Sequence, residues 1–197
     1  MNVHAPTGPA SASRPAELAA IRDPAVPAVI WRRDPPGRFL CWLDALPIDL
    51  LPAMRSVLPV AEVSGAIVAA CEAAGTPPGP ERDLLVEDVA TLAATVADLL
   101  AARHLRVRLG VVAGDGFPGF HVDHGAARLL CTYRGAGTEI RLEDGIGSLH
   151  AGDVALLRGA DWPGGAPGAA HRSPSRHVGG VRLLLAIDPI LDPEEAP

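Results

Sequence analysis

The fold is decided by residues 105–139, which read LRVRLGVVAGDGFPGFHVDHGAARLLCTYRGAGTE. The first part, 105–112, predicts a strand, and the glycine- and proline-rich run after it predicts a turn. A second apolar run over 127–133 predicts another strand, which ends at the next glycine turn. Between the turn and the second strand lies His121-Val122-Asp123, the pair on which the functional prediction depends.

The His-x-Asp pair has the spacing of two metal ligands. In an extended segment, residues two apart point to the same face, so the imidazole of His121 and the carboxylate of Asp123 can converge on one ion. The candidate for a third ligand is His171, which lies about fifty residues further along the chain. Two histidines, one carboxylate and open positions are typical of non-haem Fe(II) oxygenases.

Arg182 lies inside an apolar run, residues 181–187, eleven residues after the third candidate ligand. Leu184 and Ala186 share its face of the predicted strand, which makes that face partly buried. A buried arginine needs an anionic partner, and its planar fork suits the far carboxylate of a 2-oxo acid. Tyr133, the single tyrosine, is a second candidate contact for such a cosubstrate, with ordinary core packing as the alternative.

The rest of the chain predicts helices before residue 105 and short strands after it. An apolar run over 25–31 predicts an early strand, and two helices are expected over 60–74 and 83–103. The candidate strands after the helices are 105–112, 127–133, 138–142, 147–150, 153–158 and 180–187. Short strands without crossover helices favour an antiparallel sandwich or barrel, with the helices packed on the outside of a sheet.

This pattern predicts one folded domain. Residues 17–104 form a supporting strand and helical region, and residues 105–188 form the strand-rich core. Residues 1–16 are rich in small residues and proline and are expected to be a disordered tail, while residues 189–197 form an acidic tail.

Composition narrows the functional classes. All 17 basic residues are arginine and the net charge is −6, which argues against binding of nucleic acid or of an anionic membrane. The absence of lysine excludes Schiff-base catalysis and a P-loop lysine. Three widely spaced cysteines favour a reducing compartment. No signal peptide or membrane span is apparent, so we expect a cytoplasmic location.

Several motifs give the chain a resemblance to known families. Residues 114–123, residues 151–157, and His171 followed by Arg182 resemble the double-stranded β-helix core of Fe(II)/2-oxoglutarate dioxygenases. Residues 120–123, 128–139, 152–159 and 171–174 resemble more closely the bacterial family called domain of unknown function 1826. The resemblance implies an α+β fold, cupin-like or jelly-roll-like, with N-terminal helices outside the core. Members of that family are associated with zinc-homeostasis genes, which implies zinc as a rival metal.

Three functions remain open from the sequence. The first is an Fe(II)/2-oxoglutarate-dependent oxygenase of unknown substrate, with His121, Asp123 and His171 on iron and Arg182 and Tyr133 on the cosubstrate. The second is a non-catalytic zinc-binding protein in metal homeostasis that uses the same three ligands and acts with a metallochaperone partner. The third is a cupin-like protein with a vestigial site and an interaction role.

Overall fold

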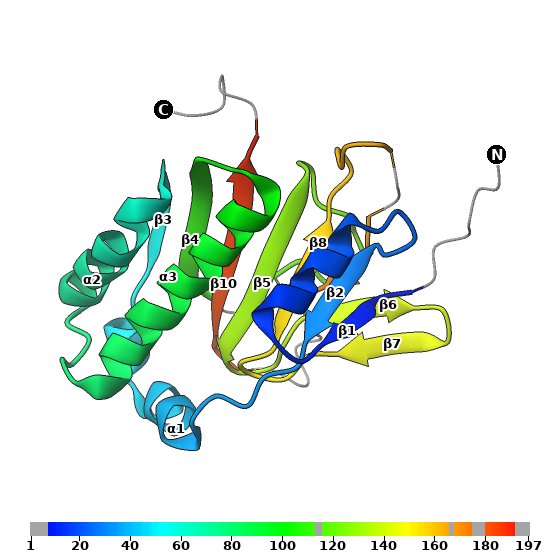
Figure 1. Cartoon of the computed structure of the whole chain (residues 1–197). Coiled ribbons are helices and arrows are strands. Elements are labelled where there is room, and N and C mark those ends of the chain that lie inside the picture. The colour runs from blue at the N-terminus through cyan, green and yellow to red at the C-terminus, as the bar shows by residue number, and fades with distance from the viewer. Residues whose placement is uncertain (1–7, 113–115, 166–167, 175–179, 192–197) are drawn as a thin grey trace, which may run out of the picture.

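The computed structural model describes residues 8–112, 116–165, 168–174 and 180–191, which form two sheets and the helices beside them. The large sheet has seven strands in the order β1-β2-β8-β5-β10-β4-β3, and the small sheet has three in the order β7-β6-β9. Apart from the parallel pair β1–β2, the strand pairs described in both sheets are antiparallel. Figure 1 shows the large sheet with α3 lying across it.

The strands are β1 (Ala10–Ala12), β2 (Ala28–Trp31), β3 (Met54–Pro59), β4 (His104–Val112), β5 (Ala127–Arg134), β6 (Glu139–Leu142), β7 (Gly145–Ser148), β8 (Val154–Arg158), β9 (His171–Arg172) and β10 (Arg182–Ile190). The α-helices are α1 (Gly37–Ala45), α2 (Val63–Ala74) and α3 (Pro80–Leu100). Three short 3-10 helices are η1 (Pro15–Arg22), η2 (Ile48–Leu50) and η3 (Val60–Glu62).

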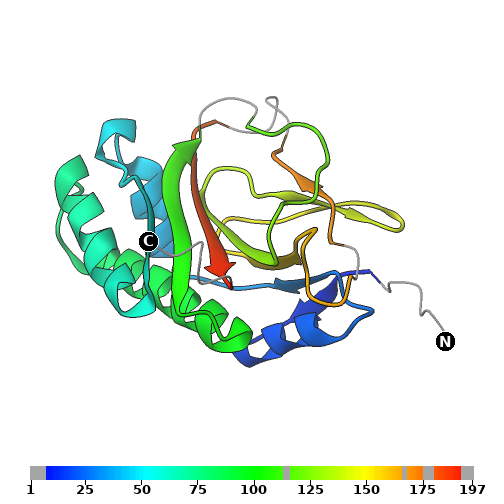
Figure 2. The ribbon, with the colours of Figure 1, turned by 90° about the horizontal axis from the view of Figure 1, so that it is seen from above.

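The helices cover the outer face of the large sheet, as the sequence predicts. In Figure 2 they line one side of the curved large sheet, and the small sheet lies on the other side. The helix α3 begins with Pro80 and carries Glu81 and Asp83 in its first turn, where negative charge favours a helix start. It ends three residues earlier than expected, because Ala101 adopts a left-handed conformation with φ 53°.

Alternation along the strands of the large sheet separates two apolar layers. The layer between this sheet and the helices includes Leu105, Val107, Leu109, Leu129, Cys131, Tyr133, Leu183, Leu185 and Ile187 from the strands, and Leu85, Val89, Leu92 and Val96 from α3. The layer between the two sheets includes Ile30, Leu130, Ile140, Leu149, Leu157 and Ala186. Because successive side chains of a strand point to opposite faces, β5 and β10 contribute to both layers.

Other elements also differ from the sequence-based expectations. Residues 10–12 were expected in a disordered tail but form β1, which pairs with β2. The strand β3 was not predicted, and it pairs with β4 along its whole length. The core was expected to end at residue 188, yet β10 continues to Ile190 because Pro189 and Ile190 still lie opposite Leu105 and His104 on β4. Residues 1–7 and 192–197 of the two expected tails lie outside the described residues.

Among the described residues, no helix combines the length and the apolar character needed to cross a membrane.

Candidate metal centre

His121 and His171 lie directly opposite each other on neighbouring extended segments. The backbone N–H of His121 donates to the carbonyl of His171 at 3.0 Å, and the N–H of His171 donates back to the carbonyl of His121 at 2.9 Å. Residues paired in this way place their side chains on the same face. The two imidazole rings have centroids 4.6 Å apart. The backbone thus brings together two histidines that are fifty residues apart in sequence.

Both imidazole rings are oriented by a backbone carbonyl two residues upstream. Nδ1 of His121 lies 3.0 Å from the oxygen of Gly119, and Nδ1 of His171 lies 3.2 Å from the oxygen of Ala169. A carbonyl oxygen can only accept, so Nδ1 carries the proton in each hydrogen bond. Nε2 of each neutral ring is then an acceptor with a free lone pair. This arrangement is typical of metal-ligating histidines.

Asp123 completes a group of three acceptors. Its Oδ2 lies 3.2 Å from Nε2 of His171, and its Oδ1 lies 3.9 Å from Nε2 of His121. One ligand atom of each of the three residues lies within 4.8 Å of the others. The Oδ2 atom of Asp123 is buried and has no hydrogen-bond partner among the described residues. A buried unpaired carboxylate oxygen that faces imidazole acceptors is stabilised by a cation, so the three side chains fit a metal ion.

Arg128 holds the other oxygen of the Asp123 carboxylate. Its Nη1 donates to Oδ1 of Asp123, and its Nε and Nη2 donate to the two carboxylate oxygens of Asp188 at 2.5 and 3.0 Å. Burial acts to raise the pKa of Asp123, but the positively charged Arg128 beside it acts in the opposite direction, and the pKa is lowered overall. The aspartate is therefore ionised and oriented, with Oδ2 directed at the histidines.

The Arg128–Asp188 pair was not predicted from the sequence. Its members are sixty residues apart and come from β5 and β10, which are neighbours in the sheet. One signal was present in the sequence, because Arg128 lies two residues before Leu130 and so shares its face of β5. Arg128 and Leu130 line the same cavity.

Arg182 is buried without an ion-pair partner among the described residues. The residue is 2% exposed, and burial lowers its pKa. Within the described part of the chain its guanidinium donates only to hydroxyl oxygens, those of Ser173 at 3.3 Å, Thr132 at 3.2 Å and Thr138 at 3.5 Å. Its Nε is buried without a hydrogen-bond partner in the structure. A cation removed from water in this way is stabilised by an anion, which the described residues do not supply.

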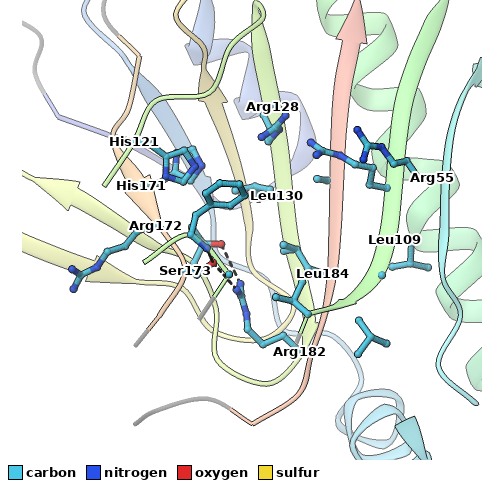
Figure 3. Close-up of a pocket in the computed structure, with 18 of the residues that line it drawn as sticks. Arg55, Leu109, His121, Arg128, Leu130, His171, Arg172, Ser173, Arg182 and Leu184 are labelled. Atoms are coloured by element: carbon cyan, nitrogen blue, oxygen red, sulfur yellow. Dashed lines mark hydrogen bonds between the residues drawn. The ribbon is translucent and has the colours of Figure 1, made fainter. Parts of the chain in front are cut away.

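One cavity joins the candidate metal centre to Arg182. It has a volume of about 320 Å³, and its lining includes His121, His171 and Arg182. Leu130, Leu184 and Ala186 supply apolar surface to the same cavity. Figure 3 shows the two histidines on one side of this cavity, with Arg182 below them beside Ser173. The size and the mixture of apolar wall with a few convergent polar groups are those of a small-molecule site.

Tyr133 does not lie in this cavity, in contrast to the predicted contact with a cosubstrate. Its side chain belongs to the layer under the helices, where its ring meets Phe39 edge-on at 6.0 Å between centroids. Burial, Cys131 and Asp88 raise its pKa, so the hydroxyl keeps its proton and donates to Oδ2 of Asp88 at 2.5 Å. Alternation on β5 explains the correction, because the Thr132 side chain points toward Arg182 and that of its neighbour Tyr133 points to the opposite face.

We expect Tyr133→Phe to leave 2-oxoglutarate affinity unchanged within about twofold and to lower the free energy of unfolding by about 1 kcal/mol, because one buried hydrogen bond is lost. Thr132→Val is the matched change on the opposite face. It removes a hydroxyl partner of Arg182 and is expected to weaken 2-oxoglutarate binding. Isothermal titration and urea unfolding of both variants measure these effects. If Tyr133→Phe lost more 2-oxoglutarate affinity than Thr132→Val, Tyr133 would have to contact the cosubstrate after all.

The two facing sheets and the site between them define a double-stranded β-helix fold with a candidate His/Asp/His centre. The structure is similar to that of dioxygenase for auxin oxidation 1 from Arabidopsis thaliana, solved as a complex with 2-oxoglutarate, with a TM-score of 0.59 and 10% identity over 97% of this chain and 95% of that chain. A 2-oxoglutarate-Fe(II) oxygenase family protein from Burkholderia pseudomallei has a TM-score of 0.46 and 12% identity over 93% and 95% of the two chains. At 10% identity, the likeness to the Arabidopsis protein shows the fold alone.

The sequence places the chain in a family. It matches the family described as protein of unknown function (DUF1826) over residues 12–188, and the chain belongs to that family. No curated protein matches the sequence. The family and the double-stranded β-helix fold expected from the motifs are both confirmed, and the activity has to be argued from the site.

Proposed function

We propose that the protein is an Fe(II)/2-oxoglutarate-dependent oxygenase that acts on a substrate not yet identified. The observation that carries the proposal is the buried Arg182, which has no anionic partner in the described residues and lines the same cavity as the two histidines. A metal-bound 2-oxo acid with a second carboxylate would satisfy both halves of that cavity at once.

In this proposal each residue of the site has one role. His121, Asp123 and His171 would hold the iron, because their oriented acceptor atoms converge. When bound, Fe(II) would activate O2, which is the oxidant, and 2-oxoglutarate would supply two electrons as it is decarboxylated to succinate and CO2. Arg182 would bind the distal carboxylate through its planar fork, with help from the Ser173 hydroxyl.

The remaining cavity residues position these groups and keep water away. Arg128 orients the Asp123 carboxylate through Oδ1. The side chains of Leu130 and Leu184 form apolar surface in the cavity and so exclude water from it. The attraction between Arg182 and a carboxylate is stronger where water is excluded.

The alternative of a non-catalytic zinc-binding protein uses the same three ligands. It assigns no role to the buried charge of Arg182, whose desolvation is a cost that a structural zinc site does not need. The oxygenase proposal accounts for this charge, and for that reason we prefer it. The metallochaperone partner belongs only to the zinc alternative, and the cytoplasmic location stays a prediction.

Anaerobic titration of the full chain tests the proposal. Addition of Fe(II) and then 2-oxoglutarate is expected to give a weak visible charge-transfer band, which Zn(II) in place of Fe(II) does not give. In air, the same sample is expected to form succinate slowly without added substrate. Tight zinc binding together with the absence of the band and of succinate would favour the zinc alternative and refute the oxygenase.

A further inference from the structure

A second cationic group lines the cavity away from Arg182. It consists of Arg55 on β3 and Arg108 on β4, called here the arginine pair, and both residues line the cavity. The two residues are direct partners across the antiparallel β3–β4 ladder. Like charges that lie directly opposite each other on neighbouring strands destabilise a sheet. Consistent with this, burial and then the charges of Arg128 and Arg55 lower the pKa of Arg108.

The acidic residues nearby do not neutralise the arginine pair. Arg55 is exposed and has no ion pair with any described residue. Arg108 has one contact, from Nη2 to Oδ2 of Asp188 at 3.1 Å, and its Nε is buried without a partner in the described chain. Arg128 already binds both oxygens of Asp188 and one oxygen of Asp123. Arg108 and Arg128 therefore share the carboxylates of Asp123 and Asp188, and Arg55 is left without a carboxylate partner among the described residues.

The arginine pair is well separated from Arg182. On β4, Arg108 lies opposite Ala186 of β10, which is four residues beyond Arg182. At a strand rise of about 3.3 Å per residue, this is a separation of about 13 Å along the sheet. Figure 3 shows Arg55 and Arg182 at different ends of the cavity, with Leu184 between them. One small dicarboxylate held by Arg182 and the metal centre would leave the arginine pair free.

We propose that the arginine pair binds the anionic group of the primary substrate, a small molecule with an oxyanion at one end and an apolar body. The apolar body would lie against the apolar part of the cavity lining, which includes Leu184, Val112 and Phe117. Phe117 is 72% exposed beside this wall, and its ring centroid lies 5.2 Å from that of His121. An apolar group bound there would be next to the metal centre.

The role of this anion as a substrate rests on the proposed function, whereas anion binding by the arginine pair does not. The test therefore uses the full chain without added metal or 2-oxoglutarate, and a pair of fluorescent probes with the same aromatic body. The anionic probe is 8-anilinonaphthalene-1-sulfonate, and the neutral probe is N-phenyl-1-naphthylamine. We expect the anionic probe to bind at least tenfold more tightly than the neutral probe.

Substitutions locate the binding site of the probe. Arg55→Gln is expected to weaken the anionic probe about threefold to tenfold and to leave the neutral probe unchanged. Because Arg55 is exposed and has no ion pair among the described residues, this variant is expected to fold normally. Arg108→Gln is expected to have a similar effect. Arg103→Gln removes another exposed arginine, outside the cavity lining, and is expected to change neither affinity.

Three results would overturn the inference. They are equal affinities for the two probes, equal effects of Arg55→Gln and Arg103→Gln, and loss of the anionic preference in Arg182→Met instead of in Arg55→Gln. The last result would place the probe at Arg182. Absence of the Fe(II)/2-oxoglutarate band, with the probe results as expected, would refute the proposed function and leave the anion site in place.

Discussion

Arg182→Met is expected to weaken the binding of 2-oxoglutarate at least about 30-fold while metal binding stays unchanged. The truncation of one partner in a buried, hydrogen-bonded charge pair costs about 2–5 kcal/mol, and about 1.4 kcal/mol corresponds to a factor of ten. Methionine fills a similar space without the charge, so the cavity wall keeps its shape. Isothermal titration with 2-oxoglutarate and with Zn(II) measures the two affinities separately.

The same substitution also distinguishes binding from support of the fold. Arg182 has only hydroxyl partners among the described residues, so an apolar replacement relieves a buried charge. We expect the free energy of unfolding to change by less than about 1 kcal/mol. Arg182→Lys keeps the charge without the planar fork and is expected to bind 2-oxoglutarate with intermediate affinity. If Arg182→Met bound 2-oxoglutarate like the parent chain, the cosubstrate assignment would fail.

His121→Ala is expected to lower metal affinity at least about 100-fold, because loss of a ligand costs more than the 10- to 100-fold typical of its supporting hydrogen bonds. His121 is more exposed than His171, with a side-chain exposure of 33% against 6%, so its removal disturbs the core less. Titration with Fe(II) under anaerobic conditions and with Zn(II) gives the affinity. The metal-dependent rise in melting temperature is expected to disappear as well.

His124→Ala is the matched control for this loss. His124 is exposed and lies three residues further along the same segment, but it is not part of the converging group. Its removal is expected to leave metal affinity unchanged. Asp123→Asn, which removes the one negative ligand, is expected to resemble His121→Ala. Equal metal affinities of the His121 and His124 variants would exclude the proposed centre.

The sequence predicts much of this arrangement because the ligands lie on short extended segments beside glycine turns. The period-two rule places His121 and Asp123 on one face, and the apolar run around Arg182 predicts its burial. The structure brings both features together in one cavity. The positions of the two longer helices could also be predicted from the sequence, because α2 ends at a glycine and α3 carries a regular apolar stripe.

Other features depend on which strands pair with each other in the sheet, and a single amino-acid sequence does not determine this pairing by inspection. The Arg55–Arg108 opposition requires β3 to pair with β4, and β3 was not predicted, since its sequence Met54–Pro59 lacks regular alternation. The Tyr133 prediction failed for a different reason. Alternation assigned it to the face of Cys131, but only the position of α3 shows that this face is the helix-covered one.

On strands with two buried faces, the residues that stabilise the fold differ from the residues that contact a bound molecule. On β10, Leu183, Leu185 and Ile187 anchor the sheet to the helices, while Arg182, Leu184 and Ala186 line the cavity. A change at one of the cavity positions can alter what is recognised without loosening the packing that keeps the chain folded. Proteins with this fold can therefore change the molecule that they bind through single substitutions at the cavity-facing positions of such a strand.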